Sequence, residues 1–203
     1  IDINQIIGKN KALISVFPGS RESEITVLMP ILIKFIQLMN NKYTDMTYVF
    51  HSTKAYSQLI QSFFDKSNLT NCEIVSDDKI KSHILQKSIF AVAKSGTVSL
   101  EISNAKIPSI ILYKMGFINF LIVKSLVRTK FANIINFAAN EEIIPELLQS
   151  DCSPKNIFEH VSNFLENPNK IKEQEDRIQK ILDKLKTNGT SSELAALSLN
   201  KFL

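Results

Sequence analysis

The amino-acid sequence predicts an α/β fold, a parallel sheet with helices on both faces, followed by a helical tail. Short apolar runs alternate with longer amphipathic stretches as far as residue 113. Strands that are separated by single helices form right-handed crossovers, so neighbouring strands run parallel. A chain of 203 residues buries about 70% of the surface that its unfolded form exposes, so it is long enough to form its own hydrophobic core. We therefore expect a Rossmann-like domain.

Five apolar runs predict the strands of this sheet. The first, Ala12–Phe17, ends at a Pro-Gly-Ser turn, which is typical of a buried strand. The other four strands are expected at Met46–His51, Cys72–Val75, Ile89–Ala93 and Ser109–Tyr113. Apolar residues at helical spacing predict the intervening helices, at Ile25–Met39, Tyr56–Phe64, Ile80–Gln86 and Val98–Ala105.

The last third of the sequence predicts helices only. Ser153-Pro154 combines a capping residue with a proline in the first turn, which indicates a helix start. Asn167-Pro168 ends that helix, and a helix rich in Lys, Glu and Gln follows. Thr190–Glu193 matches a capping box for a last helix. We expect a binding domain over residues 1–167 and a helical tail over residues 168–203.

Composition excludes several classes of protein. Hydrophobic residues make up 44% and charged residues 22%, which is ordinary for a globular protein and wrong for a disordered one. Cys72 and Cys152 lie far apart and outside any CxxC pair, which excludes a disulfide framework or zinc module and suits a reducing cytoplasm. No apolar run reaches the roughly 20 residues of a membrane helix. The chain begins with Ile1 and shows no signal-peptide pattern, so we expect it to be part of a longer protein.

Positive charge is concentrated in one region. The net charge is +4, yet residues 102–140 contain no Asp or Glu. The basic residues of that region are Lys106, Lys114, Lys124, Arg128 and Lys130. A local excess of this kind indicates an anionic partner, such as a phosphate group or a lipid surface. Nucleic acid is not expected as a partner, because these residues are few and alternate with Ile, Leu and Val.

The first candidate binding segment is Phe17–Glu22, where a strand turns into a helix. In an open parallel sheet, ligands bind at the carboxyl ends of the strands, beside helix N-termini. Gly19 lets the backbone approach a ligand, and Arg21 supplies a fork of donors that suits phosphate oxygens. A tight turn with a capping serine accounts for the same pattern without a ligand.

The second candidate segment is Ala93–Glu101, another strand end followed by a helix. Ser95-Gly96-Thr97 forms the turn, and the backbone N–H groups of the helix start point toward whatever binds above them. Glu101 lies one helical turn after Thr97, so both face the same ligand, and its carboxylate suits the two hydroxyls of a ribose.

Other polar residues predict no chemistry. His51, His83 and His160 are isolated and are interpreted as surface or packing residues. Asp77-Asp78 is interpreted as a turn, and the sequence contains neither a GxGxxG fingerprint nor a Walker A loop. No metal-binding DxD pattern occurs, so we predict neither a metal site nor a cofactor.

The two segments, in this order and on this scaffold, resemble the lipid-A-disaccharide synthases. The matching segments are FPGSR (Phe17–Arg21), SGTVSLE (Ser95–Glu101), IPSIILYK (Ile107–Lys114), FLIVKSLVRTKFANIIN (Phe120–Asn136) and IPELLQ (Ile144–Gln149). They span most of residues 11–150, and together they are far more specific than any one of them. The resemblance implies the C-terminal, donor-binding half of a two-domain GT-B glycosyltransferase. The N-terminal domain, with the acceptor site and the general base, is expected to lie outside this chain.

The resemblance also implies a reaction. Enzymes of this family transfer a diacylglucosamine unit from UDP-2,3-diacylglucosamine to 2,3-diacylglucosamine 1-phosphate, and the products are UDP and the β-1,6-linked precursor of lipid A. The chain is thus expected to bind the UDP-sugar donor, to use no metal or cofactor, and to be inactive alone. A cytoplasmic enzyme is implied, with its lipid acceptor held by the missing domain.

Family positions carry over onto particular residues. Arg21 would stabilise the charge that grows on the leaving UDP, Glu101 would hold the ribose, and the Ile80 region would offer a backbone edge to uracil. The wider set of donor-binding residues is Gly19, Ser20, Arg21, Ile80, Ser95, Gly96, Thr97, Glu101, Asn136, Glu146 and Gln149. Asn136, Glu146 and Gln149 are assigned to the donor sugar or to loop support. The sequence departs from the family at Ile135, where a proline is expected.

Two alternatives keep the same fold. One is a non-catalytic module that binds UDP-sugars, and the other is a UDP-sugar epimerase, which needs its own acid and base. The segment Phe117–Phe131 separates them from a lipid enzyme, because it interleaves apolar residues with Lys124, Arg128 and Lys130. We expect this segment to rest against the inner face of the cytoplasmic membrane, unless it is a core helix with solvated charges.

Overall fold

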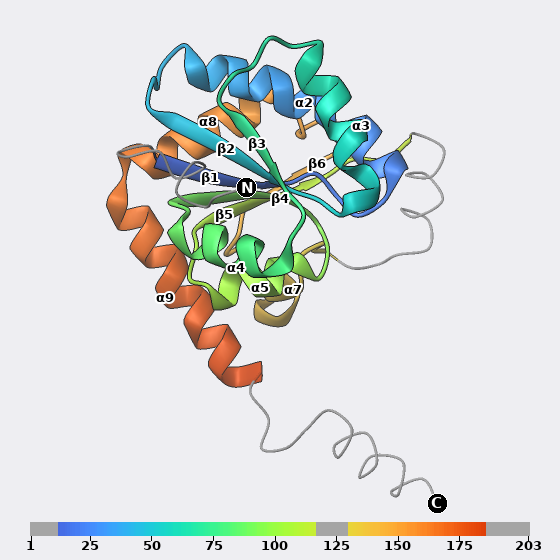
Figure 1. Cartoon of the computed structure of the whole chain (residues 1–203). Coiled ribbons are helices and arrows are strands. Elements are labelled where there is room, and N and C mark those ends of the chain that lie inside the picture. The colour runs from blue at the N-terminus through green and yellow to red at the C-terminus, as the bar shows by residue number, and fades with distance from the viewer. Residues whose placement is uncertain (1–11, 117–129, 186–203) are drawn as a thin grey trace, which may run out of the picture.

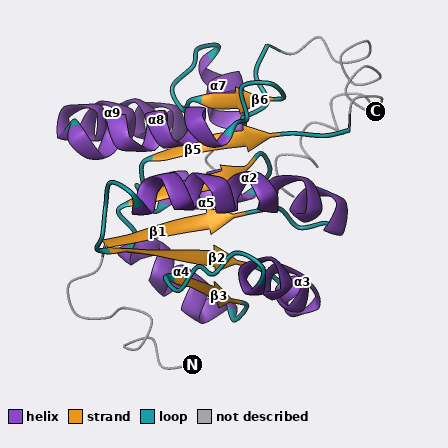
Figure 2. Cartoon of the chain, turned by 90° about the horizontal axis from the view of Figure 1, so that it is seen from above, coloured by secondary structure: helices purple, strands orange, loops and turns teal. Residues whose placement is uncertain are grey.

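The computed structural model describes residues 12–116 and 130–185, which form one sheet between two layers of helices (Figure 1). Within these residues the six strands are β1 (Ala12–Phe17), β2 (Met46–His51), β3 (Cys72–Val75), β4 (Phe90–Lys94), β5 (Ser109–Tyr113) and β6 (Glu146–Leu148). Their order across the sheet is β3-β2-β1-β4-β5-β6, and every neighbouring pair is parallel. The strands all point the same way, so their carboxyl ends lie together at one end of the sheet (Figure 2).

The helices cover both faces of the sheet. They are α2 (Glu22–Asn40), α3 (Lys54–Asp65), α4 (Asp78–Lys87), α5 (Val98–Asn104), α7 (Ile134–Ala139), α8 (Pro154–Glu166) and α9 (Pro168–Leu185). Figure 1 shows α2, α3 and α8 on one side of the sheet, and α4, α5, α7 and α9 on the other. This arrangement confirms the Rossmann-like fold class.

Side chains along each strand point alternately to the two faces of the sheet, so the strands contribute to the hydrophobic core on both sides. Ile14 and Val16 of β1 belong to the large cluster that packs with α2, α3 and α8. Leu13 points the other way and packs with Val49, Val75 and Ile84 beneath α4. Because helices cover both faces, the central strands are apolar almost throughout, as parallel sheets require.

The five expected strands are confirmed, and β4 is displaced by one residue from its expected range. The strand β6 and the helix α7 were not predicted. Each is short, and α7 depends on a cap: the side chain of Asn133 accepts hydrogen bonds from the backbone N–H groups of Ile135 and Asn136. Local patterns of three to six residues carry too little periodicity to show such elements.

Helix α8 begins and ends, and α9 begins, where the sequence indicated. Ser153 caps α8 by accepting a hydrogen bond from the Asn156 N–H, and α9 begins at Pro168. The side chain of Gln174 in α9 accepts a hydrogen bond from the Ser109 N–H at 2.8 Å and donates one to the Ser109 carbonyl at 3.1 Å. This pair ties α9 to the start of β5. Thr190–Glu193 lies outside the described residues, and the division at residue 167 stays a prediction.

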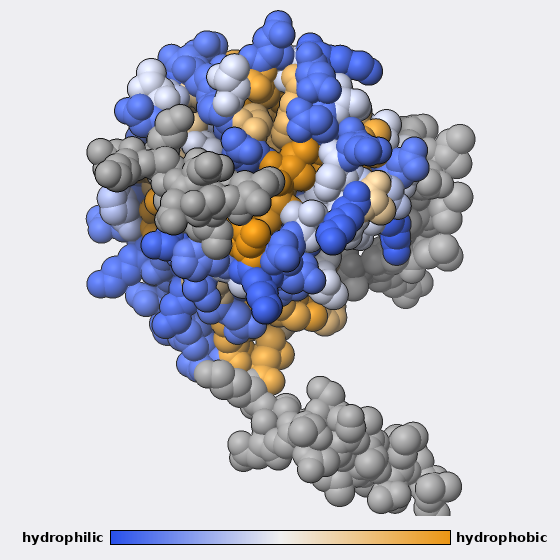
Figure 3. Space-filling model, in the orientation of Figure 1, coloured by the Kyte–Doolittle hydropathy of each residue, from blue (hydrophilic) through white to orange (hydrophobic). Residues whose placement is uncertain are grey.

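The visible surface is mostly polar. Figure 3 shows hydrophilic side chains over the helical layers and a narrow apolar band between them, where an edge of the sheet lies. Among the helices that the structure describes, none is long and apolar enough to cross a membrane.

Candidate functional site

A cavity of about 410 Å³ opens at the carboxyl ends of β1, β2 and β4. Both candidate segments contribute to its wall. The expected residues that line it are Gly19, Ser20, Arg21, Ser95, Gly96, Thr97 and Glu101. The fold therefore brings together two segments that are more than 70 residues apart in the sequence, at the edge where open parallel sheets bind ligands.

Gly19 is required by the local geometry of the first segment. Its φ angle is +120°, a conformation that other residues rarely adopt. A Cβ atom built there would lie 2.7 Å from both Cβ and Oε2 of Glu24. The next residue, Ser20, donates its backbone N–H to Glu24 Oε2 at 3.0 Å. The loop thus closes tightly over a carboxylate at the first turn of α2.

Glu24 is held ionised by its neighbours. Lys94 Nζ lies 2.8 Å from Glu24 Oε1, and an Arg21 guanidinium nitrogen lies 3.7 Å from the same oxygen. Burial by itself raises the pKa of Glu24, but the hydrogen bonds from Lys94 and Ser20 and the two positive charges outweigh it, so the pKa lies below its usual value. Two cations face one carboxylate, which leaves this end of the cavity positive.

Arg21 and Lys94 differ in freedom. The Arg21 side chain is 78% exposed, so it is free to turn toward a ligand, whereas the Lys94 side chain is 19% exposed and fixed by Glu24. Lys94 was missed as a site residue from the sequence, although a lysine that ends a buried strand directly before Ser95 is a usable signal.

The turn of the second segment, unlike that of the first, has free space beside its glycine. A Cβ atom built on Gly96 would have no described atom within 4 Å, so the space above this residue is free for a ligand. The Ser95 hydroxyl is not free, because it donates to the Ala132 carbonyl at 2.8 Å. Ser99 closes the turn by donating its hydroxyl to the Gly96 carbonyl. Thr97 and Glu101 both line the cavity, as their spacing predicted.

Ile80 is not brought to the cavity. Its backbone N–H donates to Asp77 Oδ1, and its side chain packs beside the buried cluster beneath α4. Asp77 is thus the cap of α4, which refines the turn expected at Asp77-Asp78. Asp78 and Lys81, on another face of the same helix, line the cavity and form an ion pair at 3.0 Å.

Asn136 and Glu146 lie outside the cavity in a hydrogen-bond network that also includes Asn133; we call it the Asn136 network. Asn136 is fully buried, and its amide donates to the Ile144 carbonyl at 2.7 Å and to Glu146 Oε1 at 2.8 Å. Its oxygen accepts from the N–H groups of Ile143 and Ile144. These hydrogen bonds connect α7 to the segment before β6 and to β6 itself, so the geometry favours a role in loop support.

Glu146 extends the Asn136 network toward the cavity. Its carboxylate accepts hydrogen bonds from the backbone N–H groups of Ala132 at 2.7 Å and Asn133 at 3.0 Å. Ala132 is the residue whose carbonyl holds the Ser95 hydroxyl. The Asn136 network therefore steadies the second segment from behind.

Gln149 and Ile135 each donate a hydrogen bond from the backbone N–H group. Gln149 adopts a positive φ of 48° directly after β6, and its N–H donates to the Tyr113 carbonyl. Ile135 donates its N–H to Asn133 Oδ1 at 2.8 Å. A proline, as in the family pattern, has no N–H for this bond. The departure at Ile135 is therefore part of the cap of α7.

A second cavity, of about 640 Å³, adjoins the first between α4 and α5. The two share five wall residues, namely Phe17, His51, Asp78, Lys81 and Glu101. Arg21, Lys94 and Glu24 line only the first cavity, so the positive end lies away from the shared wall. The combined groove has a cationic end at Arg21 and Lys94, while its shared wall carries Glu101, the Asp78–Lys81 ion pair and the uncharged rings of Phe17 and His51.

His51 is the residue whose position the sequence did not indicate. It is buried and stacks on Phe17 with ring centroids 4.1 Å apart and an angle of 18° between the planes. Burial, assisted by the charge of Lys81, lowers the pKa of His51 to about 3, so the ring is neutral near pH 7. It packs, as interpreted from the sequence, but it also forms part of both cavity walls.

The expected membrane-contacting segment lies mostly outside the described residues. Positions 117–129 of the basic, apolar segment Phe117–Phe131 lie outside them. In the ranges 12–116 and 130–185, no group of three or more His, Cys, Asp or Glu side chains is placed to hold a metal ion.

Comparison with known sequences gives a consistent match. A family model described as lipid-A-disaccharide synthetase matches residues 3–199. The lipid-A-disaccharide synthase of Rickettsia prowazekii (strain Madrid E) is 33% identical over 193 residues, covering 94% of this chain and 50% of that protein. The synthase of Sulfurihydrogenibium sp. (strain YO3AOP1) is 30% identical over 194 residues, covering 90% and 49%. The chain thus spans about half the length of the curated relatives it matches.

Solved structures share the fold. The C-terminal domain of a glycosyl transferase group 1 family protein from Francisella tularensis aligns with a TM-score of 0.56 at 13% identity, covering 90% of this chain and 92% of that one. A UDP-GlcNAc 2-epimerase from Neisseria meningitidis bound to UDP-GlcNAc aligns with a TM-score of 0.60 at 14% identity, covering 90% and 47%. Similarity at this level of identity concerns the fold alone, a Rossmann-like domain of the GT-B type.

Proposed function

Because the chain belongs to the lipid-A-disaccharide synthase family, we propose that its cavity binds the UDP part of the donor UDP-2,3-diacylglucosamine. In the complete enzyme, the diacylglucosamine unit passes to 2,3-diacylglucosamine 1-phosphate, and the products are the β-1,6-linked disaccharide and UDP. The proposal assigns donor binding to this chain. It assigns the acceptor site and the general base to a further domain of the complete enzyme.

The observation that carries the proposal is the unlike character of the two ends of the groove. Arg21 and Lys94 outnumber Glu24 at one end, which suits a diphosphate. The space above Gly96 lets that diphosphate approach the backbone closely. Glu101, at the shared wall, offers a carboxylate to the ribose hydroxyls. One UDP molecule would meet both ends at once.

This arrangement would assist departure of UDP. When the bond between the sugar carbon and the diphosphate oxygen breaks, its electron pair stays on that oxygen, so negative charge grows there. The exposed Arg21 guanidinium can turn onto this oxygen, and Lys94 adds a fixed positive charge beside it. Glu24 holds Lys94 in place and keeps its own charge, so the cation does not need to reorganise as the bond breaks.

Membership of the family favours the transferase over the epimerase and over the non-catalytic module. The finer domain organisation is also part of the proposal: a donor-binding domain over residues 1–167, followed by the tail. The hydrogen bonds between Gln174 and Ser109 support a tail whose first helix, α9, is attached to the start of β5.

We also propose that the complete enzyme works at the cytoplasmic face of the membrane and touches it through Phe117–Phe131. A few residues later in the sequence, Ile134 and Phe137 of α7 are 47% and 59% exposed. Vesicle sedimentation tests the contact: binding should rise with anionic lipid and fall in a Lys124→Glu, Arg128→Glu double variant. Equal binding to neutral and anionic vesicles would contradict it.

Titration calorimetry with UDP tests the proposed site. The folded chain should bind UDP both with and without magnesium, because Arg21 and Lys94 supply the charge that meets the diphosphate. UMP, which lacks the second phosphate, should bind at least tenfold more weakly. No heat from UDP, or binding only when magnesium is present, would overturn the proposal.

A further inference from the structure

A residue in the shared wall of the two cavities, His51, has a buried polar atom without a partner. His51 is 4% exposed, and its Nε2 atom lies 2.8 Å from Ser15 Oγ. Its Nδ1 atom is buried and makes no hydrogen bond to any described residue. Buried polar atoms are nearly always paired, so an unpaired one in a cavity wall needs an explanation.

The hydrogen bonds behind His51 determine where its proton lies. The Ser88 hydroxyl lies 2.9 Å from the Ile84 carbonyl, which only accepts, so Ser88 donates there. The Ser15 hydroxyl, 2.7 Å from Ser88 Oγ, must then donate to Ser88. Ser15 Oγ has no second proton and therefore accepts from His51 Nε2–H.

This chain of donors makes Nδ1 an acceptor. With the single ring proton on Nε2, the Nδ1 atom of a neutral imidazole carries a lone pair and no hydrogen. The ring is kept neutral near pH 7 by burial and by the charge of Lys81. A group that satisfies Nδ1 must therefore carry an N–H or an O–H.

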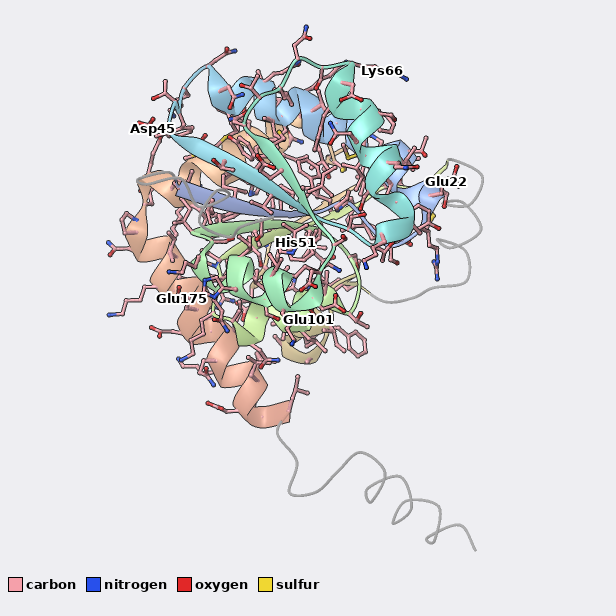
Figure 4. All side chains as sticks on the ribbon, in the orientation of Figure 1. Glu22, Asp45, His51, Lys66, Glu101 and Glu175 are labelled. Carbon is pink, nitrogen blue, oxygen red and sulfur yellow. The ribbon has the colours of Figure 1, made fainter. Side chains whose placement is uncertain are left out.

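The surroundings limit which part of a ligand reaches this atom. The His51 ring is stacked on Phe17, and the lone pair of Nδ1 lies in the plane of the ring, so a donor has to approach along the ring edge. Figure 4 shows His51 between the sheet and α4, with Glu101 on the same side of the sheet. The cationic residues Arg21 and Lys94 line the other end of the groove. Ionised phosphate oxygens carry no hydrogen, so they cannot satisfy Nδ1.

We propose that His51 is a specificity residue, whose Nδ1 atom accepts a hydrogen bond from an N–H or O–H of the nucleoside part of the ligand. The inference rests on the proposed function, in which the ligand is UDP. Uridine offers two kinds of donor, the N3–H of the base and the hydroxyls of the ribose. Both share the chemistry that Nδ1 requires.

Two substitutions separate this role from packing. In His51→Gln, the amide reaches the position of Nε2 and keeps a donor for Ser15, but the acceptor at Nδ1 is lost. In His51→Asn, an amide oxygen can occupy the position of Nδ1, while the bond to Ser15 is lost. A purely structural histidine predicts that Asn is the more damaging change, whereas a ligand acceptor predicts that Gln is.

The measurement is the Kd for UDP by titration calorimetry, with the melting temperature of each variant as a check on folding. We expect His51→Gln to weaken UDP binding about tenfold, and His51→Asn to stay within about threefold of the parent. Equal affinity in all three proteins would overturn this inference alone, because UDP would still bind. Weaker binding by Asn than by Gln would also overturn it. Absence of UDP binding by the parent would overturn the proposed function as well.

Analogues identify the group that His51 meets. 3-Methyl-UDP lacks the N3–H, and the 2′-deoxy and 3′-deoxy forms of UDP each lack one hydroxyl. The tenfold difference between the parent and His51→Gln should vanish for the analogue that lacks the partner group and persist for the others. A difference that persists with all three analogues would show that the substitution acts through the fold, and would contradict the inference.

Discussion

Asn136 and residues of the two cavity segments were all expected to bind the donor, yet they lie in opposite surroundings. Both polar ends of the Asn136 side chain are occupied by protein atoms, and the residue is fully buried. Arg21 is largely exposed, and the space above Gly96 is empty of described atoms. Polar groups whose bonds are complete within the protein brace a site. Those with spare capacity at a cavity are the ones to contact a ligand.

The contrast is strongest for removal of Asn136. Asn136→Ala would leave the Ile143 and Ile144 N–H groups and the Ile144 carbonyl without this partner in the core. We expect a loss of about 4 kcal/mol in the free energy of unfolding, because each buried unpaired group costs about 1–3 kcal/mol. In thermal unfolding, the melting temperature should fall by about 8–16 °C.

A matched control for Asn136 is Asn169→Ala, an exposed asparagine in the first turn of α9. This change should alter the free energy of unfolding by no more than about 0.5 kcal/mol. Below its melting temperature, the Asn136→Ala chain should still bind UDP. A normal melting temperature combined with lost UDP binding would mean that Asn136 contacts the ligand and does not stabilise the fold.

Arg21 should show the opposite behaviour. In the complete enzyme, Arg21→Ala should lower turnover by 10²–10³, or about 2.7–4 kcal/mol, because the charge it meets is largest in the transition state. The free energy of unfolding should hardly change, since the side chain is exposed.

Two further variants complete the Arg21 experiment. Lys34→Ala removes an exposed cation elsewhere on α2 and should leave turnover unchanged. Glu101→Gln should weaken UDP binding more than it lowers turnover, because a ribose contact does not change during the reaction. Unchanged turnover in Arg21→Ala would remove Arg21 from the catalytic role.

The two loop glycines, Gly19 and Gly96, allow effects on stability and on UDP binding to be compared within the cavity. Gly19→Ala forces a Cβ against Glu24 at a positive φ and should cost about 2 kcal/mol of stability. Gly96→Ala meets no atom of the described residues and should change stability by less than about 0.5 kcal/mol, yet its methyl group would occupy the space proposed for the diphosphate. We expect calorimetry to show UDP binding at least tenfold weaker for Gly96→Ala. Parent-like affinity in that variant would move the ligand elsewhere.

The smallest expected effect is a dependence of stability on pH. The pKa of Glu24 lies below its ordinary value in the folded chain, so folding favours its ionised form. Its contribution is complete above the unfolded pKa, near 4.5, and is lost as the pH falls through the lower folded value. Urea unfolding between pH 3 and pH 6 should therefore show a shallower loss of stability in Glu24→Gln than in the parent. Identical slopes would mean that the contacts of Glu24 do not favour its charged form.

Much of the fold was predictable because its strands are short, apolar and separated by amphipathic helices. What escaped prediction, β6 and α7, is held by the buried bonds of Asn133 and Asn136 rather than by local periodicity. In the site, the turns at Gly19 and Gly96 were predictable from strand ends. Lys94 was overlooked although it directly precedes Ser95 at a strand end, and His51 was not predictable, since a single histidine at the end of a strand carries no specific signal.

Ile80 shows the effect of helical phase. It was chosen because it follows β3, but it lies on the face of α4 that packs toward the sheet. Asp78 and Lys81, each one or two positions away, lie on the cavity side. A sequence shows that a helix follows a strand, whereas which of its faces meets the cavity depends on how the helix is docked.

The central claim is that UDP binds between Gly19–Arg21 and Gly96–Glu101, with the Asn136 network behind it. Backbone amide chemical shifts during a UDP titration test it most directly. We expect the largest shifts at Ser20, Arg21, Gly96 and Thr97, with shifts at Asn136, Glu146 and Gln149 that are small by comparison. Shifts centred on the Asn136 network, with Gly96 unmoved, would contradict it.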